Sequence, residues 1–257
     1  MRHAGAAGGE REVILVHSSD LHIDDDIEAG RYHGLDGLRF VLEAAGDLGA
    51  DAVLLAGDTF DNGRVSDAIV RKAGSMLDEA HLPVIVLPGN HDPAMPGGVF
   101  HRTGIVGRGP AMVMGHTHDE RIRLDGLDLE VLGRAHRSHG DMPPLPVVTE
   151  RSTRWQVIIA HGHYVPAEDW ESEAHRSWRI SAADLAATNV DYIALGHWDR
   201  PTAVGDGTAR AYYSGAPDLA QTVNVIRLHP TAGIAVERRP LGMPFPHRWA
   251  VGPSRGT

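Results

Sequence analysis

The segment AVLLAGDTFD, residues 52–61, contains the pattern that decides the fold. Its five consecutive apolar residues, 52–56, are too few for a typical helix and predict a short strand buried on both faces. The run stops at Gly57, and the acidic residues Asp58 and Asp61 follow directly. A buried strand that ends in glycine and carboxylates is typical of an α/β sheet whose strand ends hold a polar site.

The flanking sequence repeats this arrangement. Apolar runs at 13–16 and 84–87 predict two further buried strands, and apolar residues at helical spacing over 35–48 and 65–77 predict the helices between them. The resulting β-α-β-α-β order predicts a mainly parallel sheet in the first half of the chain.

The second half predicts shorter strands with more antiparallel pairing. We expect a hairpin turn at Asp125-Gly126. The expected strands are 112–114, 121–124, 127–132, 157–160, 192–195, 210–213, 223–228 and 234–238, with a short helix at 182–187. Since no long linker divides the chain, we predict one domain over 11–242, a flexible tail at 1–10 and an irregular tail at 243–257.

Composition limits the classes of function. The net charge of −10 argues against a nucleic-acid binder, which usually presents a basic face, although a local basic patch stays open. The absence of cysteine excludes disulfides and thiolate zinc sites. No apolar run is long enough for a membrane span and no secretory signal is present, so we expect a cytoplasmic protein.

Five polar clusters follow apolar strand candidates. They are 20–22 (DLH), 57–61 (GDTFD), 89–92 (GNHD), 161–163 (HGH) and 196–199 (GHWD). Because ligand sites converge at the carboxyl ends of strands, these clusters can meet although they are far apart in sequence. Carboxylate, imidazole and amide groups suit Mn, Fe, Zn or Mg, and the glycines allow the backbone to approach an ion closely.

The order of these clusters resembles the calcineurin-like metallophosphoesterase superfamily, whose pattern is DxH, GDxxD, GNH(D/E), a lone H, then GHxH. The resemblance spans roughly residues 12–228. The phrases LAGDTFD, LPGNHD, YIALGHWDRP and YYSGAPDL are most similar to SbcD-type DNA-repair exonucleases. This resemblance implies a four-layer α/β/β/α sandwich, with two mixed β-sheets flanked by helices.

The resemblance also implies a role for each residue that matches the motif. Asp20 and His22 would bind a first metal ion, and Asp58 would bridge it to a second ion. Asn90, His161 and His197 would bind the second ion. His91 would face the substrate as general acid or phosphate-stabilising group, oriented by Asp92, and Asp61 would support the ligands from behind.

One position departs from the family pattern. The last motif of the family ends in histidine, a ligand of the first metal, whereas this chain has Asp199. Asp199 would add a third carboxylate to the first site with a shorter reach. That change favours Mn or Mg over Zn, or leaves the first ion weakly held. We take Mn as the preferred metal.

Several other polar or aromatic residues are ambiguous. Residues 115–118, GHTH, also match the last family motif, but chain order favours the cluster at His197. Trp198, Arg200 and Tyr213 are candidates for substrate binding, with packing or surface exposure as equal alternatives. The same applies to His163 as a support for the ligands. We expect His136, His139 and His175 to be exposed to solvent.

The resulting hypothesis is a phosphodiesterase in which a hydroxide between two metal ions attacks phosphorus and His91 assists the leaving group. The substrate is a phosphate ester, and three alternatives stay open. The protein could act on DNA as an exonuclease, hydrolyse nucleotides or other small organophosphates, or serve as a non-catalytic interaction module on the same fold. The oligomeric state is not predicted.

Overall fold

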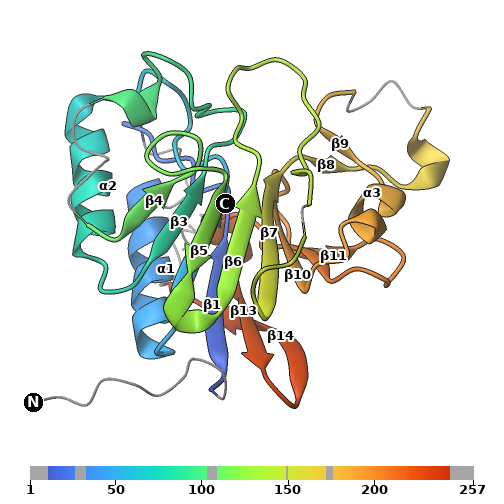
Figure 1. Cartoon of the computed structure of the whole chain (residues 1–257). Coiled ribbons are helices and arrows are strands. Elements are labelled where there is room, and N and C mark those ends of the chain that lie inside the picture. Colours follow the sequence, from blue (N-terminus) through green and yellow to red (C-terminus); the bar gives the residue numbers. More distant parts are fainter. Residues whose placement is uncertain (1–10, 27–32, 103–108, 149, 172–175, 244–257) are drawn as a thin grey trace, which may run out of the picture.

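Two six-stranded mixed sheets lie face to face at the centre of the computed structural model, with helices outside them (Figure 1). The structure describes residues 11–26, 33–102, 109–148, 150–171 and 176–243. The predicted tail at 1–10 lies outside these residues, as does the tail at 243–257 apart from Met243, which is buried. Within the described residues, no helix has the length and apolar character that crossing a membrane requires.

The first sheet contains most of the predicted parallel strands. The strands β1 to β4 are parallel neighbours. On the other side of β1, β13 pairs antiparallel with β1 and β14 pairs antiparallel with β13. The order across the sheet is β14 (Gly233–Pro240), β13 (Thr222–His229), β1 (Val13–Ser18), β2 (Ala52–Ala56), β3 (Val84–Leu87) and β4 (Ala111–Val113).

The second sheet has a parallel centre and antiparallel edges. The order across it is β11 (Thr202–Val204), β12 (Ala211–Tyr213), β10 (Tyr192–Gly196), β7 (Trp155–His161), β6 (Leu129–Gly133) and β5 (Arg121–Leu124). The strands β12, β10, β7 and β6 are parallel, while β11 and β5 pair antiparallel at the two edges. The antiparallel character expected for this half is therefore confined to the edges of this sheet and to β13 and β14.

Helices cover the outer faces unequally. Helices α1 (Gly34–Asp47) and α2 (Asp67–Glu79) lie on the first sheet, whereas the short α3 (Ala182–Ala187) lies on the opposite side of the molecule (Figure 1). The side chain of His33 caps α1 and that of Ser66 caps α2, each accepting a hydrogen bond from a backbone N–H of the first turn. A capping box of Ser181 and Asp184 begins α3.

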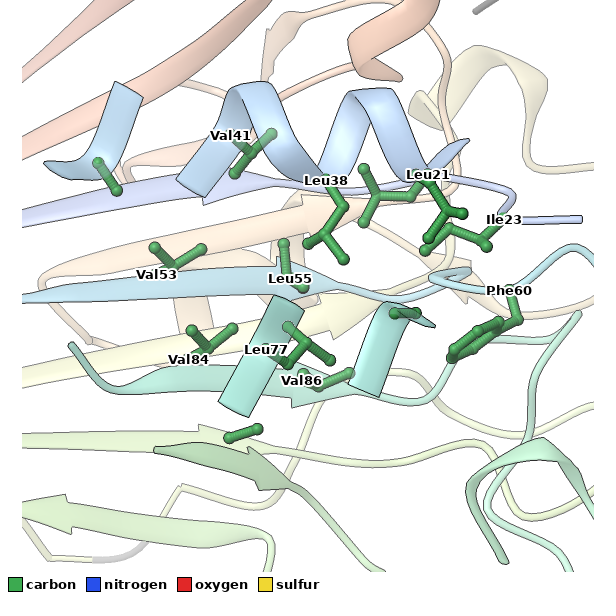
Figure 2. Close-up of a cluster of buried hydrophobic side chains, with 14 of the residues drawn as sticks. Leu21, Ile23, Leu38, Val41, Val53, Leu55, Phe60, Leu77, Val84 and Val86 are labelled. Carbon is green, nitrogen blue, oxygen red and sulfur yellow. The ribbon is translucent and has the colours of Figure 1, made fainter. Parts of the chain in front are cut away.

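Successive strand residues pack into different cores. Val53 and Leu55 of β2 contact the α1 and α2 side, whereas Leu54 faces the second sheet. Figure 2 shows Leu38 of α1 and Leu77 of α2 pointing toward the strands of the first sheet. A third cluster lies between the second sheet and α3. Because the central strands are buried on both faces, their sequences are continuously apolar.

Small elements account for the differences from the expected element order. The hairpin at 125–126 forms, but its turn is a 3-10 helix at Asp125–Leu127 followed by Asp128 in the left-handed region (φ 48°). The short α4 (Pro217–Ala220) was not predicted. Neither was the two-stranded sheet of β8 (His163–Tyr164) and β9 (Arg179–Ile180). Both have too few residues to give a periodic pattern.

Candidate metal centre

Four of the ligand candidates lie in backbone conformations that L-residues rarely adopt. The φ angles are 55° at Asp20, 44° at His22, 51° at Asp58 and 104° at His197. Backbone hydrogen bonds join the loop after β1 to the loop after β2 and hold Asp20, His22 and Asp58 in place. They run from Asp20 N to Gly57 O (3.0 Å) and from His22 N to Asp58 O (3.1 Å). Strained backbone that neighbouring structure holds in place is common at functional sites.

The glycine before Asp58 is required by close packing. Gly57 has φ 90°, and a Cβ atom added there would lie 2.1 Å from His161 Nδ1. The loop after β2 therefore touches the end of β7, which belongs to the other sheet. The absence of a side chain at Gly57 is what allows this close contact with His161.

The first ligand cluster consists of Asp20, His22 and Asp58, whose ligand atoms lie within 4.8 Å of one another. Both carboxylates are buried, with exposed fractions of 2%. His22 Nδ1 donates to Asp61 Oδ1 at 3.1 Å, which leaves Nε2 as an acceptor. A carboxylate behind an imidazole is the usual arrangement that orients a metal-binding histidine.

The second ligand cluster consists of Asp58, Asn90, His161 and His197. His161 Nε2 lies 3.1 Å from Asp58 Oδ2 and 3.0 Å from Asn90 Oδ1, and Asn90 Oδ1 lies 3.2 Å from His197 Nδ1. His161 Nδ1 donates to Ala56 O at 2.8 Å, so Nε2 can carry a lone pair toward the cluster. Electron-rich atoms that converge in this way need a proton or a cation among them, so the donor set fits a metal ion.

The pKa shifts of these residues arise from their burial and from the charges of their neighbours. Burial would lower the pKa of His161, but Asp58 and Asp20 raise it to about 9. Burial would raise the pKa of Asp58, yet His161 holds it below its usual range, whereas burial and the neighbouring Asp58 raise that of Asp20. Burial and His161 lower the pKa of His197 to about 3, so its imidazole is neutral and can bind a metal. The two buried carboxylates that raise the pKa of His161, beside the neutral imidazole of His197, thus favour positive charge at this position.

His91 lies on the more exposed side of the first ligand cluster. Its side chain is 44% exposed and its ring centroid is 4.8 Å from that of His22. His91 Nδ1 donates to Asp61 O at 2.7 Å, and its backbone N donates to Asp58 Oδ1 at 2.9 Å. In the structure, the contact that orients His91 therefore comes from Asp61, not from Asp92.

Asp92 instead joins two loops. Its carboxylate oxygens accept hydrogen bonds from Gly89 N (2.7 Å) and Phe60 N (3.0 Å), and the side chain is buried. Burial and the negative charge of Asp58 raise the pKa of Asp92 to about 7. These bonds hold the loop after β3 against the loop after β2, and they fix the positions of Asn90 and Asp58.

The remaining site candidates lie outside the two ligand clusters. Asp199 and Arg200 are exposed, and the clusters found among the described residues do not include Asp199. Trp198 stacks on Tyr213 with ring centroids 4.5 Å apart. Tyr213 is 1% exposed, and its hydroxyl donates to Gly162 O and accepts from Tyr164 N, so it supports the loop after β7 from within.

Two residues near the centre were missed. His136, expected to be solvated, is fully buried, and its Nε2 donates to His161 O at 2.9 Å. Trp178 lies beside His197, with ring centroids 5.8 Å apart. His139 is exposed as expected and donates to Asn90 O, while His175 lies outside the described residues. Nothing in the local sequence of 136 or 178 signals these positions.

The second match to the last family motif lies elsewhere. His118 contacts its neighbour Thr117, and the His116 ring packs 4.2 Å from that of His101. Neither His116 nor His118 belongs to a metal-ligand cluster among the residues that the structure describes. This arrangement agrees with the preference for His197 that chain order indicated.

Comparison with known proteins agrees with this geometry. The model of the calcineurin-like phosphoesterase family matches residues 14–201. The chain is 29% identical to the DNA double-strand break repair protein Mre11 of Haloferax volcanii, over 88% of this chain and 52% of that protein. It is 27% identical to the SbcD chain of the SbcCD nuclease of Rhodobacter capsulatus, over 90% of this chain and 70% of that protein. The chain thus spans about half the length of the Mre11 relative.

Solved structures share the fold. TT1561 of Thermus thermophilus superposes with a TM-score of 0.52 at 15% identity, over 90% of this chain and all of that chain. A putative 5'-nucleotidase from Staphylococcus aureus gives a TM-score of 0.58 at 13% identity, over 90% of this chain and 54% of that chain. At these identities the likeness concerns the arrangement of the two sheets and their helices.

Proposed function

Since the chain belongs to the calcineurin-like phosphoesterase family, we propose that it is a phosphodiesterase with nuclease-like chemistry that depends on two divalent metal ions. The observation that carries this proposal is the convergence of Asp20, His22, Asp58, Asn90, His161 and His197 from both sheets, with their acceptor atoms directed toward one another. A scaffold without catalysis has no need to bury two carboxylates in such a cluster.

In this proposal the ligands divide as the two clusters do. Asp20 and His22 hold the first ion, Asn90, His161 and His197 hold the second, and Asp58 serves both. Oxygen and imidazole donors without thiolate favour Mn, with Fe, Mg or Zn as alternatives. Bound cations supply Lewis-acid stabilisation of the phosphoryl charge and activation of water. Asp199 is a seventh candidate, and its exposed position suggests a weak hold on the first ion.

Side chains of the protein donate the proton to the leaving group and hold the reacting groups in position. Nδ1 of His91 donates to the Asp61 carbonyl, so Nε2 is the nitrogen left to meet a substrate oxygen. A protonated His91 can donate from Nε2 to the leaving oxygen and stabilise its negative charge. Asp61 contacts both His22 and His91, so it fixes the positions of the metal-binding and proton-donating groups relative to each other. Asp92 keeps the two ligand loops together.

The substrate class has one specific rival. One relative named above is a nuclease subunit and the other is a DNA double-strand break repair protein, which favours a nucleic-acid phosphodiester. The net charge of −10 favours small phosphate esters, because a long polyanion is usually bound by a basic face. Nuclease activity on DNA and turnover of nucleotides are therefore the two branches of the proposal.

A turnover panel tests it. The purified protein, stripped of metal and then supplied with Mn, Mg, Zn or Fe, is assayed on bis(4-nitrophenyl) phosphate, 4-nitrophenyl phosphate, cyclic nucleotides and linear DNA. We expect metal-dependent hydrolysis of the diester, two bound metal ions per chain by elemental analysis, and loss of both in Asp58→Asn. A steep fall of activity with salt indicates nucleic acid, and a flat response indicates small esters. A protein with no stoichiometric metal and no turnover contradicts the proposal.

A further inference from the structure

Trp178 occupies an unusual backbone position beside the metal centre. It precedes β9 and has φ 55°, a region that bulky L-residues rarely adopt. Its N–H donates to Asp141 Oδ1 at 2.6 Å, and its carbonyl accepts from His163 N at 2.8 Å. These bonds tie the residue both to the loop before β7 and to β8, which follows the candidate ligand His161.

The indole of Trp178 is fixed as well as its backbone. Nε1 donates to Gly140 O at 2.9 Å. The ring centroid lies 5.8 Å from that of His197 and 5.5 Å from that of His136, with interplanar angles of 75° and 65°. The side chain is nevertheless only partly buried. The structure thus holds a partly exposed tryptophan, with a fixed ring, next to a histidine of the second ligand cluster.

Packing alone does not account for this arrangement. A tryptophan that only fills the core needs no left-handed backbone, which is costly for a bulky side chain. The other tryptophan at the centre, Trp198, has a different environment, because one face of its ring is covered by Tyr213 at 4.5 Å. Among the described residues, the aromatic contacts of Trp178 are the edge contacts with His136 and His197, and none of them is a stacked contact.

We propose that Trp178 is a specificity residue that stacks on a planar ring of the substrate next to His197. The favoured substrates are then phosphate esters that carry an unstacked nucleobase or a similar aromatic ring. A base inside a duplex has its faces covered by its neighbours, whereas a mononucleotide or an unpaired strand end exposes them. The net charge of −10 agrees with a short ligand. This inference rests on the proposed function and names its substrate class.

Equilibrium binding to the Mn-loaded protein tests this without turnover. The two probes are deoxyadenosine 5'-monophosphate and 2-deoxyribose 5-phosphate, which differ only by the base. We expect the wild type to bind the nucleotide more tightly by about 5- to 150-fold, the range for one stacked base. Trp178→Leu should remove this preference, Trp178→Phe should keep most of it, and neither should change affinity for the sugar phosphate.

Trp170→Leu is the matched control, because the Trp170 ring is also partly exposed but lies under the Arg179 guanidinium, 3.8 Å from the ring centroid. It should keep the full preference. Equal binding of both probes by the wild type overturns the inference, even if esters are hydrolysed and the proposed function stands. Equal weakening of both probes in Trp178→Leu overturns it too, because Trp178 would then only support His197. A base preference that depends on Trp178 supports it even if no ester turns over.

Discussion

His91 and the candidate ligand residues differ in how many contacts fix each side chain. His161 uses both ring nitrogens within buried structure, whereas His91 has one fixed nitrogen and a side chain that is 44% exposed. A ligand needs a rigid position and a lone pair. A proton donor needs access to substrate. This difference agrees with the two roles proposed for His161 and His91, although both residues contact Asp58.

Replacing His91 should therefore affect turnover more than metal binding. In His91→Asn we expect kcat to fall by about 10²- to 10⁴-fold, the usual contribution of a general acid. Metal content by elemental analysis should stay at the wild-type value. His118→Asn, which changes a histidine of the loop at 115–118, is the matched control and should keep both properties. A His91 variant that loses its metals and regains full turnover when metal is resupplied would contradict this role.

Asp199 is the position at which the proposed first metal site could gain a stronger ligand. The family pattern has histidine at this position, and a neutral imidazole reaches further than the carboxylate of Asp199. We expect Asp199→His to tighten binding of the more weakly held Mn ion by about tenfold, or about 1.4 kcal/mol. Asp199→Asn should leave that affinity nearly unchanged, because the side chain is exposed and lies outside the clusters. Calorimetric titration of the metal-free proteins with Mn measures both, and equal affinities in all three would contradict the prediction.

At the residue scale, sequence motifs identify the candidate ligands but not the residues that contact them from distant parts of the chain. Asp58 and Asn90 are recognisable because each follows a glycine at the end of an apolar run. His136 and Trp178 are not, because their importance comes from neighbours 25 and more residues away, such as His161 and Asp141. The position of Asp92 within a motif likewise does not reveal that its hydrogen bonds go to Gly89 and Phe60.

At the scale of elements, the loops that follow β2 and β7 must fit against each other. A Cβ at Gly57 would lie 2.1 Å from His161 Nδ1, and φ is 90°. Gly57→Ala should therefore lower both stability and metal affinity, with an expected loss of about 1–3 kcal/mol in the free energy of unfolding from backbone strain alone. Urea unfolding and metal analysis provide the measurements.

Gly46→Ala is the control for this substitution. Gly46 lies in the last turn of α1, and a Cβ there meets nothing within 4 Å. Alanine in a helix is more stable than glycine by about 0.5–1 kcal/mol, so this variant should be slightly more stable and keep its metals. If Gly57→Ala matched Gly46→Ala in both measurements, the close contact between the two loops would not matter.

Apolar runs without a polar interruption allowed most elements to be predicted. The strand at 52–56 was predicted at its observed bounds, because a strand buried on both faces leaves no polar interruption. Pairing was harder to predict. β12 is parallel to β10 and antiparallel to β11, and which neighbour a three-residue strand takes depends on the position of the whole sheet. The helix predicted over 65–77 begins only at Asp67, because Ser66 caps it.

At the scale of the whole molecule, the candidate metal centre depends on the relative position of the two sheets. Asp20, Asp58 and Asn90 follow strands of the first sheet, whereas His161 and His197 lie at strand ends of the second. A ligand set divided in this way requires a fixed interface between the sheets. The apolar cluster of Leu54, Leu87, Val157 and their neighbours supplies most of that interface.

A buried polar contact at His17 also crosses this interface. His17 of β1 is fully buried, and its Nδ1 lies 3.0 Å from the hydroxyl of Tyr192 in β10 and 3.4 Å from the amide nitrogen of Asn224 in β13. Burial lowers the pKa of His17 to about 3 from its ordinary value of 6.5. The folded protein therefore keeps this imidazole neutral at pH values where the unfolded chain takes up a proton.

His17 should make the fold sensitive to mild acid. Its contribution is fully present above pH 6.5 and is lost as the pH falls from 6.5 toward 3, because the unfolded state then binds one more proton. Urea unfolding of metal-free wild type and His17→Gln at pH 7.5 and pH 5 measures this. Between these values the wild type should lose about 2 kcal/mol more than the variant, since one proton is worth about 1.4 kcal/mol per pH unit. Equal losses would show that the proton enters the folded state too, so that the link between the sheets tolerates a charged imidazole.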